Sequence, residues 1–399
     1  MTCPTLTTVL WLTLWAVASA RSAAQSTPLA IDDLQVLRVV ALAGVAPRAE
    51  VKPVIVLLDA GDGAEATRLD AEGYAILTVA ADDVAMAQLA ALQDDVLRIR
   101  RAVAAEAERL RLDPDRVFFL RAGFRLATDT TFFRARGYDY DMDVRFPAPA
   151  TTASPVPVVL QIAHKTGCRR CHGSFARYGD GLLDALALLG YATAHADHYG
   201  AGFRDYDKVD WMPQAVHPAK AAVQFLRANA RAFGLDTARV LALGFSKGGT
   251  AAAMLAVTGD VPEFELGDPA ASPSSRVTAA LSIGAYLDLP TLYADADGDI
   301  DERWENPLAQ WGPPELRPNH WRAGSATSYV SAGDAPLMLV AGGADSYRPR
   351  QQARMAALLD SAGVAHETLV VPGLGHALPA EAEHLEAVAA FIERWVGRP

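Results

Sequence analysis

The most informative segment of the 399-residue chain reads Val240-Leu-Ala-Leu-Gly-Phe-Ser-Lys-Gly-Gly-Thr-Ala-Ala-Ala-Met254. The run Arg239–Leu243, which contains its apolar beginning, is typical of a buried strand, and Lys247–Val257 has the small residues of a tightly packed helix. Ser246 lies at the junction in a Gly-x-Ser-x-Gly pattern, whose glycines let the backbone turn sharply. A strand, a serine on a sharp turn and a helix together predict a nucleophile elbow.

An activated serine needs a base and an acid that orients the base. Asp345 ends the run Leu339-Val-Ala-Gly-Gly-Ala-Asp, and His376 ends Pro372-Gly-Leu-Gly-His after the next apolar run. The chain order Ser, Asp, His therefore predicts a catalytic triad of Ser246, Asp345 and His376. Two backbone N–H groups are expected to bind the oxyanion, those of Lys247 and of Lys165.

Strand-like and helix-like segments alternate after residue 156. The expected strands are Val158–Ala163, Tyr191–Ala196, Arg239–Leu243, Val277–Ile283, Pro336–Ala341 and Glu367–Val371. The expected helices are Phe175–Leu189, Pro213–Phe233, Lys247–Val257, Arg350–Ala362 and Ala380–Val396. This alternation predicts an α/β fold with a mainly parallel sheet that helices cover on both faces. Residues 286–333, rich in Asp, Pro and Trp, break the alternation and are expected to form a lid.

The N-terminal segment 30–125 alternates in the same way, with likenesses to the later segment in the same order. Lys52-Pro-Val-Ile-Val resembles Val156-Pro-Val-Val-Leu, Glu72-Gly-Tyr-Ala resembles Leu189-Gly-Tyr-Ala, and Leu112-Asp-Pro-Asp-Arg-Val resembles Leu235-Asp-Thr-Ala-Arg-Val. Either the segment is a degenerate, non-catalytic repeat, or two βαβ units share one compositional style. Arg125 stands where the repeat would need its serine. The segment is expected to pack against a catalytic domain spanning residues 137–397.

The first residues and the cysteines indicate in which cellular compartment the protein functions. Residues 1–20 carry no charged side chain and end in Ala-Ser-Ala, which predicts a cleaved signal peptide and a secreted or periplasmic protein without a membrane span. Cys168 and Cys171, in Cys-Arg-Arg-Cys-His, would then be the remaining cysteines, and a disulfide between them is predicted. The same string is the c-type haem attachment pattern, and a metal site or reactive dithiol also remains open.

The net charge of −11 makes nucleic acid an improbable partner, because no basic surface is expected.

An acidic run with Asp295, Asp297, Asp299 and Asp301 is similar to a calcium loop. Its spacing departs from the full twelve-residue pattern, so a solvated acidic loop is the preferred interpretation.

Together these motifs resemble the α/β-hydrolases, and most of all the bifunctional feruloyl and acetyl xylan esterases, a group of carbohydrate esterases, with dienelactone-hydrolase-like enzymes on the same scaffold. The resemblance covers about residues 137–397 and includes Tyr138–Pro147, Pro213–Asn229, the elbow, Asp345 and His376. It implies a serine esterase that uses an acyl-enzyme route on a small-molecule or carbohydrate ester, without a cofactor. A peptidase of the prolyl-oligopeptidase-like type and a non-catalytic binding protein on the same scaffold are the alternatives.

Overall fold

The strand that leads to Ser246 lies inside an eight-stranded sheet with the order β12-β11-β10-β9-β7-β8-β6-β5. The computed structural model describes residues 29, 31, 34–43, 51–59, 63–81, 84–135, 138–148, 155–163, 180–197, 216–259, 261–267, 272–296, 315–377, 379 and 381–399. The strands of this main sheet are β5 (Phe124–Ala135), β6 (Tyr138–Pro147), β7 (Val156–Ile162), β8 (Ala192–Ala196), β9 (Leu235–Phe245), β10 (Ala279–Ile283), β11 (Leu337–Gly342) and β12 (His366–Val371). From β8 to β12 neighbouring strands are parallel, while β6 is antiparallel to both β5 and β8. The predicted mainly parallel sheet is confirmed.

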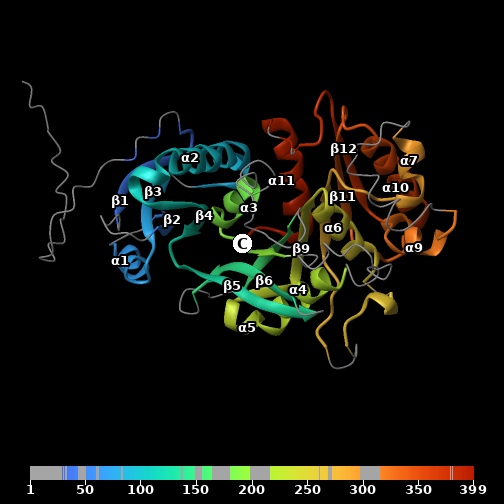
Figure 1. Cartoon of the computed structure of the whole chain (residues 1–399), viewed down its shortest axis with the longest axis horizontal. Coiled ribbons are helices and arrows are strands. Elements are labelled where there is room, and N and C mark those ends of the chain that lie inside the picture. The colour runs from blue at the N-terminus through green and yellow to red at the C-terminus, as the bar shows by residue number, and fades with distance from the viewer. Residues whose placement is uncertain are drawn as a thin grey trace, which may run out of the picture.

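Helices pack on both faces of the main sheet, because its strands send apolar side chains alternately to either side (Figure 1). The helices that follow the first strands of the main sheet are α3 (Asp180–Leu188), α4 (His217–Ala228), α5 (Ala230–Phe233), α6 (Lys247–Val257), α10 (Arg348–Ala362) and α11 (Ala382–Val396). Leu183 of α3 and Phe391 of α11 belong to the core on one face, and Val223 of α4 and Met254 of α6 to the core on the other. Within the described residues, no helix is both long and apolar enough to cross a bilayer.

The segment predicted to be a lid is described in two pieces, 286–296 and 315–333. They contain short helical elements, namely η5 (Leu289–Thr291), α7 (Leu292–Asp295), α9 (Pro318–Ala323) and η6 (Ala326–Ser328). Trp321 is fully buried there in a small cluster with Tyr286 and Tyr347. Trp321 is therefore a packing residue, while Trp304 and Trp311 lie outside the described residues.

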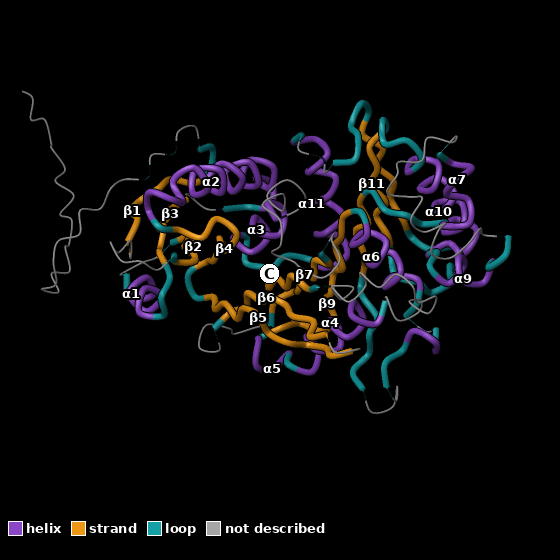
Figure 2. Tube along the Cα trace, in the orientation of Figure 1, coloured by secondary structure: helices purple, strands orange, loops and turns teal. Residues whose placement is uncertain are grey.

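The N-terminal segment forms a sheet of its own, with the order β1-β3-β2-β4 (Figure 2). Its elements are β1 (Leu37–Ala43), β2 (Lys52–Leu58), α1 (Ala64–Ala71), β3 (Ala75–Ala81), η1 (Met86–Gln88), α2 (Leu89–Leu110) and β4 (Leu112–Arg121). The chain then enters β5, which is the edge strand of the main sheet. The main sheet therefore begins at Phe124, before the boundary at 137 that the sequence suggested.

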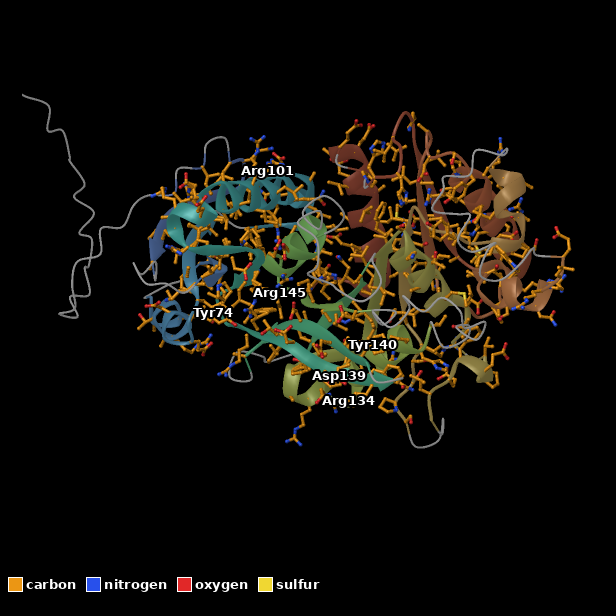
Figure 3. All side chains as sticks on the ribbon, in the orientation of Figure 1. Tyr74, Arg101, Arg134, Asp139, Tyr140 and Arg145 are labelled. Atoms are coloured by element: carbon orange, nitrogen blue, oxygen red, sulfur yellow. The ribbon has the colours of Figure 1, made fainter. Side chains whose placement is uncertain are left out.

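The two sheets meet across α2 and α3. One continuous hydrophobic core includes Val54 of β2, Val96 of α2, Leu183 of α3 and Val388 of α11. Asp184 of α3 accepts hydrogen bonds from Arg100 of α2 at 2.5 Å and from Arg145 of β6 at 2.5 Å, and it is 1% exposed. Arg145 is labelled in Figure 3, where it lies between the N-terminal sheet and the main sheet. The packing of the N-terminal segment against the rest of the chain thus includes a buried ionic contact.

Other elements differ in their limits from the expectations. Asn229 divides the helix expected over 213–233 into α4 and α5, and its side-chain amide donates to the carbonyl of Phe225 at 2.8 Å. Asparagine favours such local bonds over continued helix. The predicted signal peptide, residues 1–20, lies outside the described residues and stays a prediction.

Candidate active site

Ser246 lies on the turn between β9 and α6 with φ 56° and ψ −121°. A serine rarely adopts this conformation, and such strain is typical of functional sites. The turn is possible because Gly244 has no side chain: a Cβ atom there would lie 2.1 Å from the carbonyl oxygen of Gly248. The Ser246 amide donates to the carbonyl of Ile283 on β10 at 2.8 Å, which fixes the turn to the neighbouring strand. The observed backbone is that of the predicted nucleophile elbow.

The three residues predicted to form a triad lie together at the carboxyl ends of β9, β11 and β12. His376 Nε2 lies 3.1 Å from Ser246 Oγ, and His376 Nδ1 lies 2.9 Å from Asp345 Oδ2. Parallel strands bring their carboxyl ends to one edge, so loops far apart in sequence can meet there. The Asp345 side chain is 5% exposed, whereas that of His376 is 36% exposed. The imidazole is therefore accessible, while the carboxylate behind it is shielded.

Arg348 holds the other oxygen of Asp345. Its Nη1 donates to Asp345 Oδ1 at 2.5 Å, and its Nε donates to the carbonyl of Gly284 at 2.6 Å. Burial raises the pKa of Asp345, but the hydrogen bond from His376 and the charge of Arg348 outweigh it and hold that pKa below its usual value. Asp345 is therefore ionised at neutral pH and accepts a hydrogen bond from the Nδ1–H group of His376.

The imidazole of His376 is also confined by its neighbours. Its ring stacks on Phe245, with the centroids 4.6 Å apart and the planes 29° apart. Gly284, with φ 56°, lies behind the ring, and a Cβ atom there would come within 3.2 Å of His376 Cε1 and Nδ1. These two contacts limit the positions that the imidazole can take. They favour the one in which Nε2 faces Ser246.

Donors for an oxyanion can be located in part. Lys247 is the first residue of α6, so its amide points out of the helix N-terminus beside Ser246. Lys165, Cys168 and Cys171 lie outside the described residues. The second oxyanion donor and the disulfide stay predictions.

Tyr286 and Arg348 were not singled out from the sequence. Tyr286 follows β10, and its ring lies against the guanidinium of Arg348, 5.0 Å from the guanidinium carbon to the ring centre. Tyr286 and Arg348 lie 40 and 102 positions after the serine, as their numbers give, and neither belongs to a motif. The sequence offered one indication of a role at the site: each residue follows the carboxyl end of a strand, β10 or β11, at the edge of the sheet where the triad lies.

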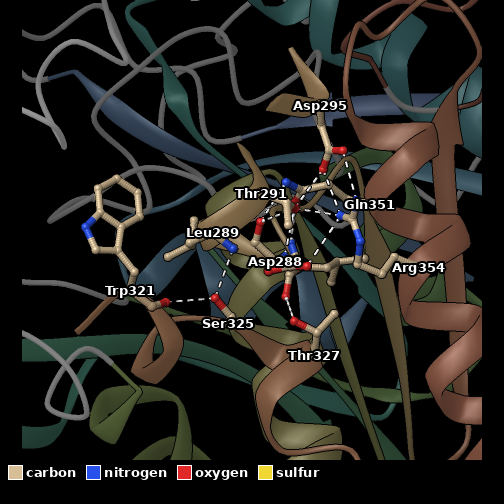
Figure 4. A network of polar contacts seen from close by, with 10 residues as sticks. Asp288, Leu289, Thr291, Asp295, Trp321, Ser325, Thr327, Gln351 and Arg354 are labelled. Atoms are coloured by element: carbon tan, nitrogen blue, oxygen red, sulfur yellow. Dashed lines mark hydrogen bonds and ion pairs between the residues drawn. The ribbon is translucent and has the colours of Figure 1, made fainter. Parts of the chain in front are cut away.

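Asp295 belongs to the acidic run that is similar to a calcium loop, and its carboxylate is paired with the guanidinium of Arg354. Its carboxylate accepts hydrogen bonds from Arg354 at 2.8 and 3.0 Å and from Thr291 at 2.8 Å (Figure 4). Burial raises the pKa of Asp295, but these bonds lower it overall. Asp297, Asp299 and Asp301 lie outside the described residues. Arg354 also lies 3.4 Å from Asp288, so this network links the described part of the 286–333 segment to α10.

The strand order, the strained elbow and the Ser–His–Asp contacts define the chain as an α/β-hydrolase. More particularly, it belongs to the BD-FAE family, whose match covers residues 142–358. The match includes Ser246 and Asp345 and ends before His376. The family consists of esterases with the α/β-hydrolase fold.

Individual relatives are more distant. Esterase LipC of Mycobacterium tuberculosis (strain ATCC 25618 / H37Rv) is 26% identical over 200 residues, which are 50% of this chain and 47% of that protein. The chain thus matches about half the length of this curated relative.

Solved structures share the fold at low identity. A truncated form of a carbohydrate esterase from gut microbiota matches with a TM-score of 0.55 and 18% identity, over 69% of this chain and 97% of that one. A bifunctional GH43-CE of Bacteroides eggerthii matches with a TM-score of 0.55 and 22% identity, over 68% and 38%. An esterase of Thermogutta terrifontis, Est2 with propionate bound, matches with a TM-score of 0.52 and 20% identity, over 69% and 96%.

Proposed function

We propose that the chain is a serine esterase that hydrolyses carboxylic esters through an acyl-enzyme. The observation that carries the proposal is the continuous hydrogen-bonded line from Asp345 through His376 to Ser246, with lengths of 2.9 and 3.1 Å, on a strained elbow. Membership of an esterase family supports the choice of ester as the bond that is cleaved.

In acylation, Ser246 Oγ attacks the ester carbonyl carbon while its proton passes to His376 Nε2. Negative charge then develops on the carbonyl oxygen, and in this proposal the Lys247 amide at the start of α6 stabilises it. When the tetrahedral intermediate collapses, the carbon–oxygen bond to the alcohol breaks, and His376 Nε2 gives its proton to that oxygen. Asp345 remains ionised and stabilises the imidazolium in between.

In deacylation, a water molecule replaces the alcohol. Its oxygen attacks the acyl carbon and its proton passes to His376 Nε2. The bond between the acyl carbon and Ser246 Oγ then breaks, and Oγ takes the proton back from Nε2. The products are a carboxylic acid and the free enzyme.

An ester on a carbohydrate is our proposal for the substrate class. Two of the structures with this fold are named as a carbohydrate esterase and as a bifunctional GH43-CE enzyme. Secretion, proposed from the leader sequence, would give the enzyme access to extracellular polysaccharides.

Ser246→Ala is the direct test. It removes the nucleophile, so kcat on p-nitrophenyl acetate should fall by roughly three orders of magnitude or more. A fluorophosphonate probe should label the wild-type protein and not the variant. Ser361→Ala, an exposed helical serine that bonds to the carbonyl of Ala357, is the matched control and should keep full activity and labelling.

Substrate panels then decide the class. Acetylated xylan, feruloyl esters and a peptide amide are compared with p-nitrophenyl esters of increasing acyl length. If the peptide amide is cleaved at rates comparable with those of the esters, the protein is a peptidase and not an esterase. A wild-type protein that neither reacts with the probe nor cleaves any ester would be a binding protein on a hydrolase scaffold.

A further inference from the structure

Arg348 is a buried cation beside the triad that the mechanism above does not use. It is the first residue of α10, and its amide donates to the carbonyl of Asp345, three positions earlier, at 3.1 Å. Its side chain is 6% exposed. A guanidinium so far removed from water has to be compensated by hydrogen-bond acceptors and a negative charge. The positions of these acceptors indicate what Arg348 does.

The first acceptor is the acid of the triad. Arg348 Nη1 donates to Asp345 Oδ1 at 2.5 Å, while Asp345 Oδ2 lies 2.9 Å from His376 Nδ1. Each oxygen of the carboxylate therefore has its own donor. Because a guanidinium is planar and its N–H groups point in fixed directions, the bond to Oδ1 restricts rotation of the carboxylate. This restriction keeps Oδ2 directed at the imidazole.

The second acceptor belongs to the residue that packs against the imidazole. Arg348 Nε donates to the carbonyl of Gly284 at 2.6 Å. A Cβ atom at Gly284 would lie 3.2 Å from two atoms of the His376 ring, so the Gly284 backbone limits where the ring can lie. Gly284 follows β10 and Asp345 follows β11. The side chain of Arg348 thus joins two loops that both contact His376.

Two buried tyrosines hold the guanidinium in place. Its carbon lies 5.0 Å from the centre of the Tyr286 ring and 4.6 Å from that of the Tyr347 ring. The two rings are stacked, with their centres 6.1 Å apart and their planes at 20°. A guanidinium over aromatic faces is stabilised most where water is excluded. These contacts favour one position of the guanidinium, the position from which it bonds to both acceptors.

We propose that Arg348 is a positioning residue of the triad, whose guanidinium fixes the Asp345 carboxylate and the Gly284 backbone and thereby holds His376 Nε2 toward Ser246 Oγ; this inference rests on the serine mechanism proposed above. Both of these hydrogen bonds end on residues that contact His376, so Arg348 acts on the serine indirectly. It keeps its proton throughout the reaction. A small displacement of a reacting group can lower a rate about 100-fold, so the loss of these bonds should be visible in the reactivity of the serine.

Arg348→Ala is the main test, because it removes the guanidinium. The second-order rate constant for labelling by a fluorophosphonate probe and kcat/KM on p-nitrophenyl acetate should both fall about 100-fold, since each depends on attack by Ser246. Every molecule should still be labelled in the end. A residue needed only for folding would instead lower the fraction that is labelled and leave the rate constant of that fraction at the wild-type value. That result would overturn the proposal.

Free guanidinium should restore the reactivity of Arg348→Ala. At millimolar concentration, guanidinium chloride should raise the labelling rate constant about tenfold, because the planar cation can again bond to Asp345 and Gly284. Sodium chloride of equal ionic strength should not. A labelling rate that guanidinium leaves unchanged would mean that the missing group is not what positions the triad, and the proposal would be wrong.

Arg348→Lys separates the charge from the geometry, and it decides the question if Arg348→Ala does not fold. Lysine keeps the positive charge but has a single nitrogen, which cannot reproduce the two fixed bonds. The labelling rate constant should therefore fall about tenfold although the charge remains. A rate constant within about twofold of the wild-type value would refute the positioning role.

Arg145→Ala is the matched control, because Arg145 is another buried arginine that bonds to a carboxylate. Its side chain is 8% exposed, and its Nη2 donates to Asp184 Oδ1 at 2.5 Å. It pairs with Thr193 near the start of β8, whereas the triad lies at the carboxyl ends of the strands. Arg145→Ala should lose thermal stability and keep the labelling rate constant of the wild type. Slower labelling that guanidinium restores in this variant too would contradict a specific role for Arg348.

Labelling of the wild type distinguishes the two proposals. If the fluorophosphonate probe does not label the wild-type protein, the serine mechanism itself fails. If it labels the wild type and both Arg348 variants at the same rate, the serine mechanism stands and the positioning role of Arg348 is wrong.

Discussion

The N-terminal sheet and the centre of the main sheet are built alike. The order β1-β3-β2-β4 has the strand directions antiparallel, parallel, parallel, and so does the order β6-β8-β7-β9. In the main sheet, the last of these strands, β9, leads into the helix α6 through the turn that carries Ser246. In the N-terminal sheet, the last strand, β4, leads directly into the strand β5. Two sheets of the same topology therefore end differently, one in a candidate catalytic turn and the other in a simple connection.

The likeness extends to the register of the strands. Val54 pairs with Ala75 just as Val158 pairs with Ala192, and these are corresponding residues of the segments that resemble each other in sequence. The next strand pairs, β2–β4 and β7–β9, also carry a register shift at the same place. It lies after Lys52–Leu112 in one sheet and after Val156–Leu235 in the other.

Isolated hydrogen bonds correspond as well. The amide of Lys52 donates to the carbonyl of Arg111 at 3.0 Å, and the amide of Val156 donates to that of Gly234 at 3.0 Å. Unrelated βαβ units would share the direction of the crossover, but not the same shift in register. We therefore propose that residues 37–123 are a partial repeat of the main sheet that lacks the nucleophile.

The register corrects the position at which the repeat lacks its nucleophile. Counting equal numbers of residues from Leu112 and Leu235 leads to Gly123 and Ser246, so Arg125 is not the equivalent residue. Both equivalents have positive φ, 83° for Gly123 and 56° for Ser246. The Gly123 amide donates to Glu65 Oε2 at 3.0 Å, so a carboxylate occupies this turn.

The largest effect is expected where the two sheets join. Asp184→Ala removes the carboxylate that neutralises Arg100 and Arg145, and leaves both guanidinium groups buried. Breaking a buried pair in this way costs about 3–5 kcal/mol, because the two buried positive charges lose the carboxylate that neutralises them. Urea unfolding followed by circular dichroism should show this loss in the free energy of unfolding.

The control for that change is Asp94→Ala. Asp94 pairs with Arg98 on the same helix at 2.7 Å, and both side chains are more than a third exposed. Such a pair contributes only about 0.3–0.5 kcal/mol. If Asp184→Ala costs no more than Asp94→Ala, the ionic contact does not hold the repeat to the catalytic sheet.

The sequence predicted the parts that depend on local pattern. The elbow, the alternation of strands and helices and the order of the triad residues follow from short motifs and apolar periodicity, and the structure places Ser246, His376 and Asp345 together. The edge strand β5 was missed because Phe124–Ala135 mixes threonines and charges with its aromatic residues and gives no clear alternation. The contact of Arg348 with Asp345 and the Gly284 carbonyl could not be predicted, because contacts between distant strands depend on how the strands align in three dimensions.

An intermediate effect is expected at the start of the repeat. Asp95, fully buried on α2, accepts hydrogen bonds from the amides of Gln35, Val36 and Leu37 at 2.7, 2.6 and 2.8 Å. In the main sheet β5 covers the equivalent strand β6, whereas β1 is an edge strand that depends on this carboxylate. Asp95→Ala should cost about 2 kcal/mol, because buried amides lose their acceptor.

Hydrogen exchange should show where that cost arises. Amides of β1 should exchange faster in Asp95→Ala, while those of β7 and β9 keep the protection of the wild type. Asp70→Ala, which removes only an exposed contact with Lys52 at 3.3 Å, is the control. Uniformly faster exchange in both sheets would contradict a local role for Asp95.

The smallest effect tests the equivalence of the two sheets directly. Arg111 and Gly234 end corresponding helices in the left-handed conformation, with φ 55° and 60°. Glycine adopts this conformation without steric cost, whereas a residue with a Cβ atom is strained there. Arg111→Gly should therefore raise the free energy of unfolding by about 0.5–1 kcal/mol, and Gly234→Ala should lower it by about 1 kcal/mol.

The two changes should be additive, because each acts on its own backbone turn and the turns lie in different sheets. Thermal unfolding of the single and double variants measures both effects, and the double variant should melt close to the wild type. If Arg111→Gly instead destabilises the protein, the arginine side chain contributes more than its backbone strain costs. The two helix ends would then have the same geometry but different energetics, and the repeat would have diverged at this position in more than its sequence.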